Sequence, residues 1–528
     1  MEEGRADEVE GRRGPGFRHF ARSWRLSSVV LLSFSSGLPL GIVWFAIPAW
    51  MARVGVDIKV IGLFTLAQAP WTFKLLWSQW MDRFPPPFLG RKRGWIVIGQ
   101  VALFAVTLWL AGASDHPEAV WVIGALALAM AFASATQDVA IDAYAVEVLH
   151  RDEQGLASGL RTASYRAAML VAGGAAITLA AETSWTLVNA LLALLYLPFM
   201  VVTVLAPEPE SLPSPPRTLK EAVWGPFVGF LAQHRSLEIL GFVVLYKLGD
   251  NLTQSLTGPF LVQTGFDDFD VGLARTTIGQ VASIVGTLIG GVLTDRMGLG
   301  RSLWVFGFLQ LASNLGYAAV AQVGPNRPVM YAAQAFELGS SGLGQGAFGV
   351  LLLRLTQKRF SATQYALLSA LFSLPRILAG PVTGVLADAM GWRDFFILTV
   401  AFGIPGMAML ARFVPWGVRD VEFEVREPTR GRPLSGRGLL LRAAGGALAA
   451  LLVGLGTIAL VGGLRAVRAG HGFAPLPALA TVAAPSTVAE WITTVGLAVL
   501  AALGGLATAA TLVARGGLER SERSPGGE

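Results

Sequence analysis

The chain has 528 residues, of which 53% are apolar and only 14% are charged, whereas soluble proteins average about 25% charged residues. This composition excludes a soluble enzyme of this length and indicates a membrane protein with many spans, each of about 20 apolar residues. The net charge of +6 fits cationic cytoplasmic loops, so we expect no nucleic-acid partner. The absence of Cys excludes disulfides and thiolate metal sites.

Apolar windows bounded by charged or turn residues predict an all-α polytopic membrane protein with fourteen transmembrane helices. The first window is longer than the core of a signal peptide and lacks a cleavage signal, so we expect it to remain as the first span. Most of the 41 Lys and Arg residues fall on one side of the membrane when the N-terminus is placed inside, which predicts two cytoplasmic termini. In chain order the predicted spans run near 28–49, 60–81, 95–112, 119–146, 156–180, 185–205, 238–262, 273–294, 302–321, 329–353, 363–387, 394–413, 439–464 and 489–514.

Two polar breaks divide these spans into six, six and two. The first break is rich in proline and the second in arginine. We therefore expect a cytoplasmic tail (1–27), a six-helix bundle (28–206), a cytoplasmic linker (207–237), a second six-helix bundle (238–414), a further linker (415–438), two additional transmembrane helices (439–514) and a cytoplasmic tail (515–528).

The two six-helix segments carry matching motifs. Asp82 and the basic run after it are echoed by Asp295 and its basic run, and Arg166 at the middle of the fifth span is echoed by Arg376 at the middle of the eleventh. Both pairs are separated by nearly the same number of residues. Duplicated halves of this kind are typical of transporters.

Nine ionisable residues within the predicted spans are candidates for functional roles. A charge there costs a few kcal/mol unless it has a partner or an aqueous cavity, so we expect these residues to meet in one water-filled central chamber. The cations exceed the anions by one, which suggests internal pairing with a spare cation for an anionic guest. The cations are Lys74, Arg161, Arg166, Lys247 and Arg376, and the anions are Asp138, Asp142, Asp250 and Glu337.

Asp138 and Asp142 are four residues apart and therefore share one helical face. One interpretation makes them proton acceptors, because burial and a like-charged neighbour both favour the protonated form. The alternative is a cytoplasmic gate or a structural ion pair with Arg161 or with the cluster at 91–93.

Span seven concentrates Lys247, Asp250, Asn251 and Gln254 near its midpoint. These residues either line the transport site, or Lys247 and Asp250 form a self-sufficient pair. Arginines at the span midpoints can clamp carboxylates with two hydrogen bonds, or can neutralise acidic residues of the protein itself.

Aromatic rings in the first two spans, Trp44 and Trp71, are candidates for stacking on a sugar, although tryptophan is also common at the membrane interface. Span ten contains Gly339–Gly342, which matches a serine-protease motif, followed by a dinucleotide-like glycine run. All five histidines lie outside the predicted spans, so no base accompanies the serine, and the glycine run lacks a preceding strand. Close helix packing explains both glycine runs, and we predict no enzyme activity.

Three strings resemble the AmpG-type permeases of the major facilitator superfamily. They are SSGLPL (35–40), the segment from Lys74 through MDRFPPPFLGRKRGW (81–95), and ATQDVAIDAY (135–144). The resemblance implies the superfamily fold, with two pseudo-symmetric six-helix halves plus two extra helices. It also implies proton-driven import of anhydro-muropeptides across the bacterial inner membrane, by rocking of the two halves around a cavity lined by spans one, four, seven and ten.

These considerations together assign three groups of candidate residues. We expect small-molecule cargo, protons and lipid as the partners of a monomer, with no cofactor and no metal; another anionic solute such as acetyl-coenzyme A, or a drug, is the alternative cargo. The proton-coupling candidates are Asp138, Asp142, Asp250 and Glu337. The substrate-binding candidates are Trp44, Trp71, Lys74, Gln137, Arg166, Lys247, Asn251, Gln254, Gln280 and Arg376. The gating candidates are Gly37, Asp82, Arg83, Arg91, Arg161, Asp295, Arg296 and Arg301.

Overall fold

The computed structural model describes an all-helical chain, with no β-strand in the described ranges. A helix satisfies its own backbone hydrogen bonds, which is the requirement for crossing a lipid bilayer. The described residues are 20, 22–57, 60, 64–114, 120–209, 214–231, 233, 235–421, 423, 435–468, 470 and 472–516.

The N-terminal half, here residues 22–209, contains a helical run at each of the first six predicted spans. Local capping sets two of the starts, because the hydroxyls of Ser23 and Ser184 accept the Leu26 and Leu187 N–H groups. The elements are α2 (Trp24–Gly41), η2 (Ile42–Ala46), α3 (Ile47–Arg53), η3 (Phe64–Gln68), α5 (Ala69–Phe73), α6 (Leu75–Arg83), α7 (Arg93–Ala113), α8 (Val120–Val148), α9 (Gln154–Leu170), η5 (Val171–Ala175), α10 (Ala176–Glu182), α11 (Trp185–Leu194) and α12 (Tyr196–Leu205).

The C-terminal half, here residues 235–421, contains a helical run at each of the next six predicted spans. Asn326 caps the start of α19 by accepting the Val329 N–H. The elements are α14 (Ser236–Leu245), α15 (Leu248–Thr264), α16 (Asp268–Gly272), η6 (Leu273–Ile278), α17 (Gly279–Met297), α18 (Leu299–Val323), α19 (Arg327–Leu355), η7 (Lys358–Phe360), α20 (Ser361–Met390) and α21 (Trp392–Phe413).

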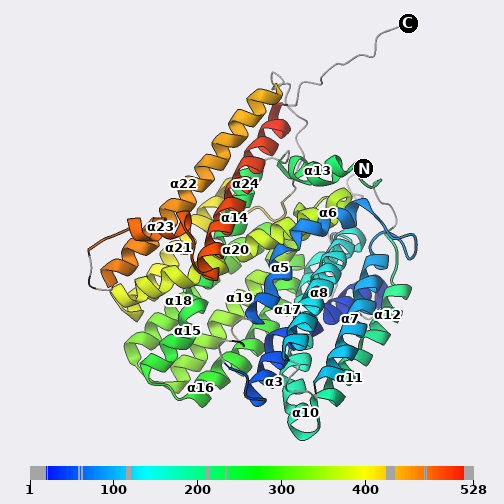
Figure 1. Ribbon diagram of the computed structural model, residues 1–528, viewed down its shortest axis with the longest axis horizontal. Coiled ribbons are helices and arrows are strands. Elements are labelled where there is room, and N and C mark those ends of the chain that lie inside the picture. The colour runs from blue at the N-terminus through cyan, green and yellow to red at the C-terminus, as the bar shows by residue number, and fades with distance from the viewer. Residues whose placement is uncertain are drawn as a thin grey trace, which may run out of the picture.

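Four further helices lie outside these two halves. The pair α22 (Gly436–Arg468) and α24 (Val488–Gly516), joined through the short α23 (Leu476–Ala483), packs side by side at one edge of the bundle (Figure 1). Helix α13 (Leu219–Leu231) contacts α24. It lies within the predicted cytoplasmic linker 207–237, for which the sequence predicted no transmembrane span.

Ten of the described helical runs are long and apolar enough to cross a membrane. The runs that contain α6, α15, α19 and α20 are not among these ten. Buried ionisable side chains such as Lys74, Asp250 and Glu337 lie in or beside these helices. Each predicted span nevertheless overlaps a described helix.

The two halves meet mainly where α9 packs against α17 and α19, and where α20 packs against α6 and α8. Small residues allow close approach: a Cβ added to Gly159 would lie 2.8 Å from the Thr287 carbonyl oxygen. The glycines of span ten serve the same purpose, because a Cβ on Gly342 would lie 2.4 Å from the Ser283 carbonyl oxygen of α17. This contact supports helix packing rather than an enzyme motif as the reason for the glycine run.

Candidate functional site

Asp82, at the end of α6, binds the first turn of α20 in the other half. Its carboxylate accepts the Ala362 and Thr363 N–H groups at 3.2 and 2.9 Å, and the Thr363 hydroxyl at 2.8 Å. Lys92 donates to the same carboxylate at 2.6 Å, and both side chains are almost completely buried. A carboxylate at a helix N-terminus is favoured by the free N–H groups and the helix dipole.

Asp295, at the end of α17, makes the corresponding contact in the opposite direction. It accepts the Gly155 and Leu156 N–H groups of α9 at 2.8 and 2.7 Å. Nearby, Arg354 reaches Gln154 of the N-terminal half at 3.3 Å and Asp420 at 2.8 Å. The halves are therefore closed against each other at the end of the bundle that carries the two aspartates.

Four other gating candidates lie at or near this closed end: Arg83, Arg91, Arg296 and Arg301. Arg91 donates to the Arg359 carbonyl at 2.7 Å, whereas Arg83 stacks on Phe84 of its own loop. Arg301 reaches the Gly417 carbonyl at 3.4 Å, and the Arg296 carbonyl accepts a bond from Arg419 at 3.3 Å. Gly37 is a packing residue, since a Cβ there would lie 2.2 Å from the Tyr165 carbonyl oxygen of α9.

A cavity of about 940 Å³ lies between the halves, away from the closed end. Its walls come mainly from the fifth, seventh, eighth and tenth helical runs, and span four contributes nothing, which differs from the expected lining by spans one, four, seven and ten. The reason is that α9 and α17 pack tightly against each other where the two halves meet, so residues of these two helices border the cavity. The candidate residues that line this cavity are Arg166, Asn251, Gln254, Gln280 and Glu337.

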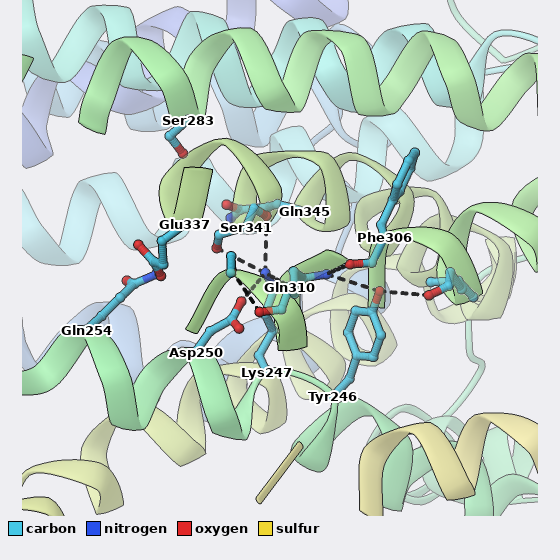
Figure 2. Close-up of polar contacts among 12 residues, drawn as sticks. Tyr246, Lys247, Asp250, Gln254, Ser283, Phe306, Gln310, Glu337, Ser341 and Gln345 are labelled. Carbon is cyan, nitrogen blue, oxygen red and sulfur yellow. Dashed lines mark hydrogen bonds and ion pairs between the residues drawn. The ribbon is translucent and has the colours of Figure 1, made fainter. Parts of the chain in front are cut away.

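Glu337 is the carboxylate of this cavity among the described lining residues. It is only 1% exposed, and its Oε1 accepts a hydrogen bond from Gln254 at 2.9 Å (Figure 2). Its Oε2 accepts no hydrogen bond, and Glu337 forms no ion pair within the described part of the chain. A buried carboxylate oxygen without a donor is costly when charged, so this group is suited to carry a proton.

Arg166 stands between the large cavity and a second, smaller one. Its guanidinium donates to the Ser283 hydroxyl of α17 and, at 2.8 Å, to the Gln345 amide oxygen of α19. Arg166 lines the large cavity, and Gln345 lines the small one. The Arg166–Gln345 hydrogen bond thus lies where the two cavities approach each other.

The small cavity, of about 280 Å³, contains the acidic pair of span four. Asp138 accepts from Ser36 and pairs with Lys74 at 3.2 Å. Asp142 pairs with Arg161 at 2.5 Å and lies 3.8 Å from Lys74. Two carboxylates and two cations therefore balance, and the structural pair of Asp142 with Arg161 that the sequence allowed is present.

Lys247 and Asp250 form an internal pair at 2.9 Å (Figure 2). Lys247 also donates to Gln310 and, at 3.1 and 3.0 Å, to the carbonyl and hydroxyl of Ser341. The two side chains are 4% and 5% exposed and line neither of the two cavities. In this conformation they are satisfied by the protein, which is the second interpretation that the sequence left open.

The charged candidates whose side chains are described consequently lie at two cavities and in one buried pair rather than in a single chamber. Trp44 and Trp71 contact each other edge to face, with ring centroids 6.4 Å apart, and pack on the apolar core rather than lining either of the two cavities. Gln137 donates to Ser35 at 3.0 Å, in the helix contact between α8 and α2. The side chain of Arg376 lies outside the described residues.

Several cavity residues were absent from the sequence-based candidates, among them Phe45, Arg275 and Gln334 in the large cavity and Tyr365 in the small one. Phe45 lies in the π-helical segment η2, where an extra residue per turn changes which side chains face inward. Arg275 lies in another such segment, η6, near the start of the eighth span. Arg275 lies at the end of a span, where interfacial arginines are common. The only signal for it in the sequence was therefore the presence of a charge at that position.

Comparisons with known proteins agree with this architecture. Residues 29–380 match the family model of the Major Facilitator Superfamily. The anhydromuropeptide permease of Escherichia coli is 41% identical over 388 residues, which cover 73% of this chain and 79% of that protein. A Rickettsia conorii protein with the transporter name AmpG 4 is 28% identical over 74% of this chain and 96% of its own length.

A solved structure with the same fold is the human organic anion transporter MFSD10, with a TM-score of 0.56 and 14% identity over 73% of this chain and 99% of that one. Both the family match and the 41% identical relative cover most of the chain. The described helices, their two mutually capped halves and the cavity between them are those of a membrane transporter. The chain belongs to the Major Facilitator Superfamily, within its branch of AmpG-type permeases.

Proposed function

We propose that this protein imports anhydro-muropeptides, which are N-acetylglucosaminyl-anhydro-N-acetylmuramyl peptides, from the periplasm into the cytoplasm. Protons that move inward down their gradient together with the cargo drive this import. The observation that carries the cargo assignment is the 41% identity to a permease named for anhydromuropeptides, across 79% of that protein. The proposal includes a monomer in the bacterial inner membrane with both termini in the cytoplasm. The distribution of Lys and Arg along the sequence supports this orientation.

The chemistry of the large cavity supports a cargo that is large, polar and anionic. Its volume of about 940 Å³ is at the upper end of the range of about 300–1,000 Å³ for small-molecule pockets. Amide side chains such as Asn251, Gln254 and Gln280 line it, and these can donate to and accept from sugar hydroxyls and peptide groups. Phe45 supplies an apolar face beside them.

Alternating access then follows from the closed end of the bundle. With the Asp82 and Asp295 end placed in the cytoplasm, the described conformation is the one closed to the cytoplasm. Import requires these interhalf bonds to break and the opposite side to close. Cargo drives that change only if it binds the two conformations with different affinity.

Glu337 is our preferred proton carrier among the four candidates. Asp138, Asp142 and Asp250 each have a cationic partner that stabilises the charged form. Glu337 forms no such pair within the described part of the chain and borders the cargo cavity. Protonation of Glu337 therefore costs no existing ion pair, and cargo bound in the cavity is close enough to alter its charge state.

The decisive experiment measures uptake of labelled muropeptide by proteoliposomes, with and without an imposed pH gradient. We expect the gradient to accelerate uptake by the wild-type protein. Glu337→Gln should retain cargo exchange between the two sides, which needs no net proton movement, but should lose the response to the gradient. Asp394→Asn, at an exposed position, is the matched control and should respond like the wild type.

Two results would contradict separate parts of the proposal. Equal wild-type uptake in the presence and absence of the gradient would eliminate proton coupling. A protein that ignores muropeptides but takes up acetyl-coenzyme A or a drug would eliminate the cargo assignment.

A further inference from the structure

The described lining of the large cavity has an excess of positive charge. Two guanidinium groups line it, Arg166 from α9 and Arg275 from η6, against the single carboxylate of Glu337. Neither arginine forms an ion pair with a described residue. Elsewhere in the described interior, Lys74, Lys92, Arg161 and Lys247 all have acidic partners.

The Arg275 guanidinium occupies a space that a glycine of the neighbouring helix leaves open. A Cβ added to Gly258 of α15 would lie 2.4 Å from Nη1 of Arg275. Gly258 follows Thr257, which also lines the cavity. Among the described residues, the Arg275 side chain donates no hydrogen bond although it has five N–H donors. Arg275 is exposed and faces the cavity beside Gly258, so its guanidinium is available to bind an external anion.

The two arginines are anchored at different levels of the η6 and α17 run. Arg166 donates to Ser283 on α17, and Ser283 follows Arg275 by eight residues along the η6 and α17 run. At about 1.5 Å of rise per helical residue, these two levels are roughly 12 Å apart. An extended peptide covers this distance in about three to four residues, at about 3.3–3.6 Å each.

We propose that Arg166 and Arg275 form a two-point anion clamp that selects cargo carrying two carboxylates several residues apart. This inference rests on the proposed function, and it assigns the clamp to the peptide portion of the muropeptide. Arginine suits both points, because its planar fork binds a carboxylate with two hydrogen bonds. The sugar portion is left to the amides and to Phe45.

The charges of the clamp also explain how cargo and proton bind together. With Glu337 protonated, the described lining carries two positive charges and matches a dianion. With Glu337 ionised, the net charge is one positive and leaves the dianion unbalanced. Dianion binding and protonation of Glu337 therefore favour each other, and the coupling is reciprocal by thermodynamic linkage.

The test compares two ligands and three proteins by direct binding to the purified protein in nanodiscs. The ligands are an anhydro-muramyl tripeptide with its C-terminal carboxylate free and the same compound with that carboxylate amidated. The proteins are the wild type, Arg166→Gln and Arg275→Gln, with Arg393→Gln as a control because Arg393 is exposed outside the cavity. Each protein is first checked for an unchanged melting temperature.

We expect amidation to weaken wild-type and Arg393→Gln binding at least about tenfold, as for loss of one charge-assisted hydrogen-bonded pair. One of the two cavity variants should lose this discrimination and bind both ligands within about twofold. The other variant should bind both ligands more weakly by the same factor, because the arginine that it lacks binds the carboxylate that both ligands retain.

Several outcomes would overturn the clamp. If both glutamine variants still discriminate between the free and the amidated ligand, or if neither does, there are not two separate anion-binding points. The clamp is also contradicted if the wild type binds the two ligands equally well. If the wild type binds neither ligand, the proposed cargo is wrong and the clamp falls with it. If a glutamine variant unfolds, Arg166→Lys or Arg275→Lys replaces it, and a lysine variant should keep discrimination with weaker binding.

Discussion

Asp82 and Asp295 hold the two halves together by reciprocal contacts. Each lies at the end of a helix in one half and accepts N–H groups from the first turn of a helix in the other half, at 2.7–3.2 Å. The duplicated motif that the sequence shows is therefore a pair of equivalent latches. Asp82 has an additional buried partner in Lys92, so Asp295 offers the cleaner test of the latch.

Asp295→Asn should shift the protein away from the conformation closed at this end. The neutral amide loses the charge that the α9 N-terminus favours, which is worth about 0.3–1 kcal/mol or somewhat more when buried, so we expect a population change of a few fold. Because the chain has no Cys, a Thr162→Cys substitution in the small cavity would be the only thiol. Its labelling by an impermeant maleimide from the Asp82 side should accelerate by that factor.

The control for this labelling experiment is Glu182→Gln, at an exposed position remote from the latch. It should leave the labelling rate of Thr162→Cys unchanged. An Asp295→Asn protein that labels at the same rate as its parent would show that the latch does not set the conformational equilibrium.

Lys74→Met should destabilise the N-terminal half strongly. It leaves Asp138 without its cation and Asp142 with Arg161 alone, and breaking a buried pair costs about 3–5 kcal/mol. We expect a lower melting temperature in detergent, measured by tryptophan fluorescence. The double variant Lys74→Met/Asp138→Asn should recover part of the loss, and strictly additive effects of the two substitutions would argue against the pairing.

Gly286→Ala should weaken the contact between α17 and α19. Its Cβ would lie 2.2 Å from the Gly339 carbonyl oxygen, so the backbones must separate, at about 1–3 kcal/mol for overpacking. Gly112→Ala is the matched control because nothing lies within 4 Å of its added Cβ. There the better helix propensity of alanine, about 1 kcal/mol, should raise the melting temperature. Equal changes in both variants would contradict the packing argument.

Asp420 should contribute a small, pH-dependent stabilisation to the loop after α21. Burial alone would raise the pKa of the Asp420 carboxyl, but hydrogen bonds from Arg354 and the Leu299 N–H outweigh it and hold the pKa below its ordinary 3.8. A group with a lowered pKa in the folded state stabilises above its unfolded pKa and loses that contribution as the pH falls through the folded pKa.

Asp420→Asn is therefore expected to lower the free energy of unfolding slightly at pH 7, by no more than about 1 kcal/mol because half the side chain is exposed, and to lower the melting temperature accordingly. The difference from the wild type should disappear as the pH falls below 3.8. Melting curves across this pH range check the expectation, with Asp394→Asn as the exposed control. A difference that grows in acid would have the wrong sign for this mechanism.

Much of the fold was predictable because membrane insertion imposes a strong local constraint. Each predicted span overlaps a described helix, since about 20 apolar residues and the need for internal hydrogen bonds leave few alternatives. Helix α13 was missed because the polar, proline-rich composition of the linker 207–237 hides the short apolar stretch that packs against α24. Spacing of four residues also placed Asp138 and Asp142 on one face, as the small cavity shows.

The arrangement of the site was less predictable because it depends on contacts between distant helices. The sequence singled out Lys247 as a site residue or a self-paired one, and only the positions of Gln310 and Ser341 decide that it is satisfied internally. A π-helical segment places Phe45 in the cavity while Trp44 packs on the core. No periodicity in the sequence reports such a local change of helical register.

The sequence by itself determined the membrane-spanning class, the duplicated halves and the inventory of buried charges, because hydropathy and motif spacing are properties of a linear chain. The tertiary structure alone decided which charges neutralise one another and which remain open to cargo. Those pairings join residues far apart in the chain, as in the approach of Arg166 to Ser283 and Gln345. The free energy of a buried charge depends on its surroundings in space rather than on its neighbours in sequence.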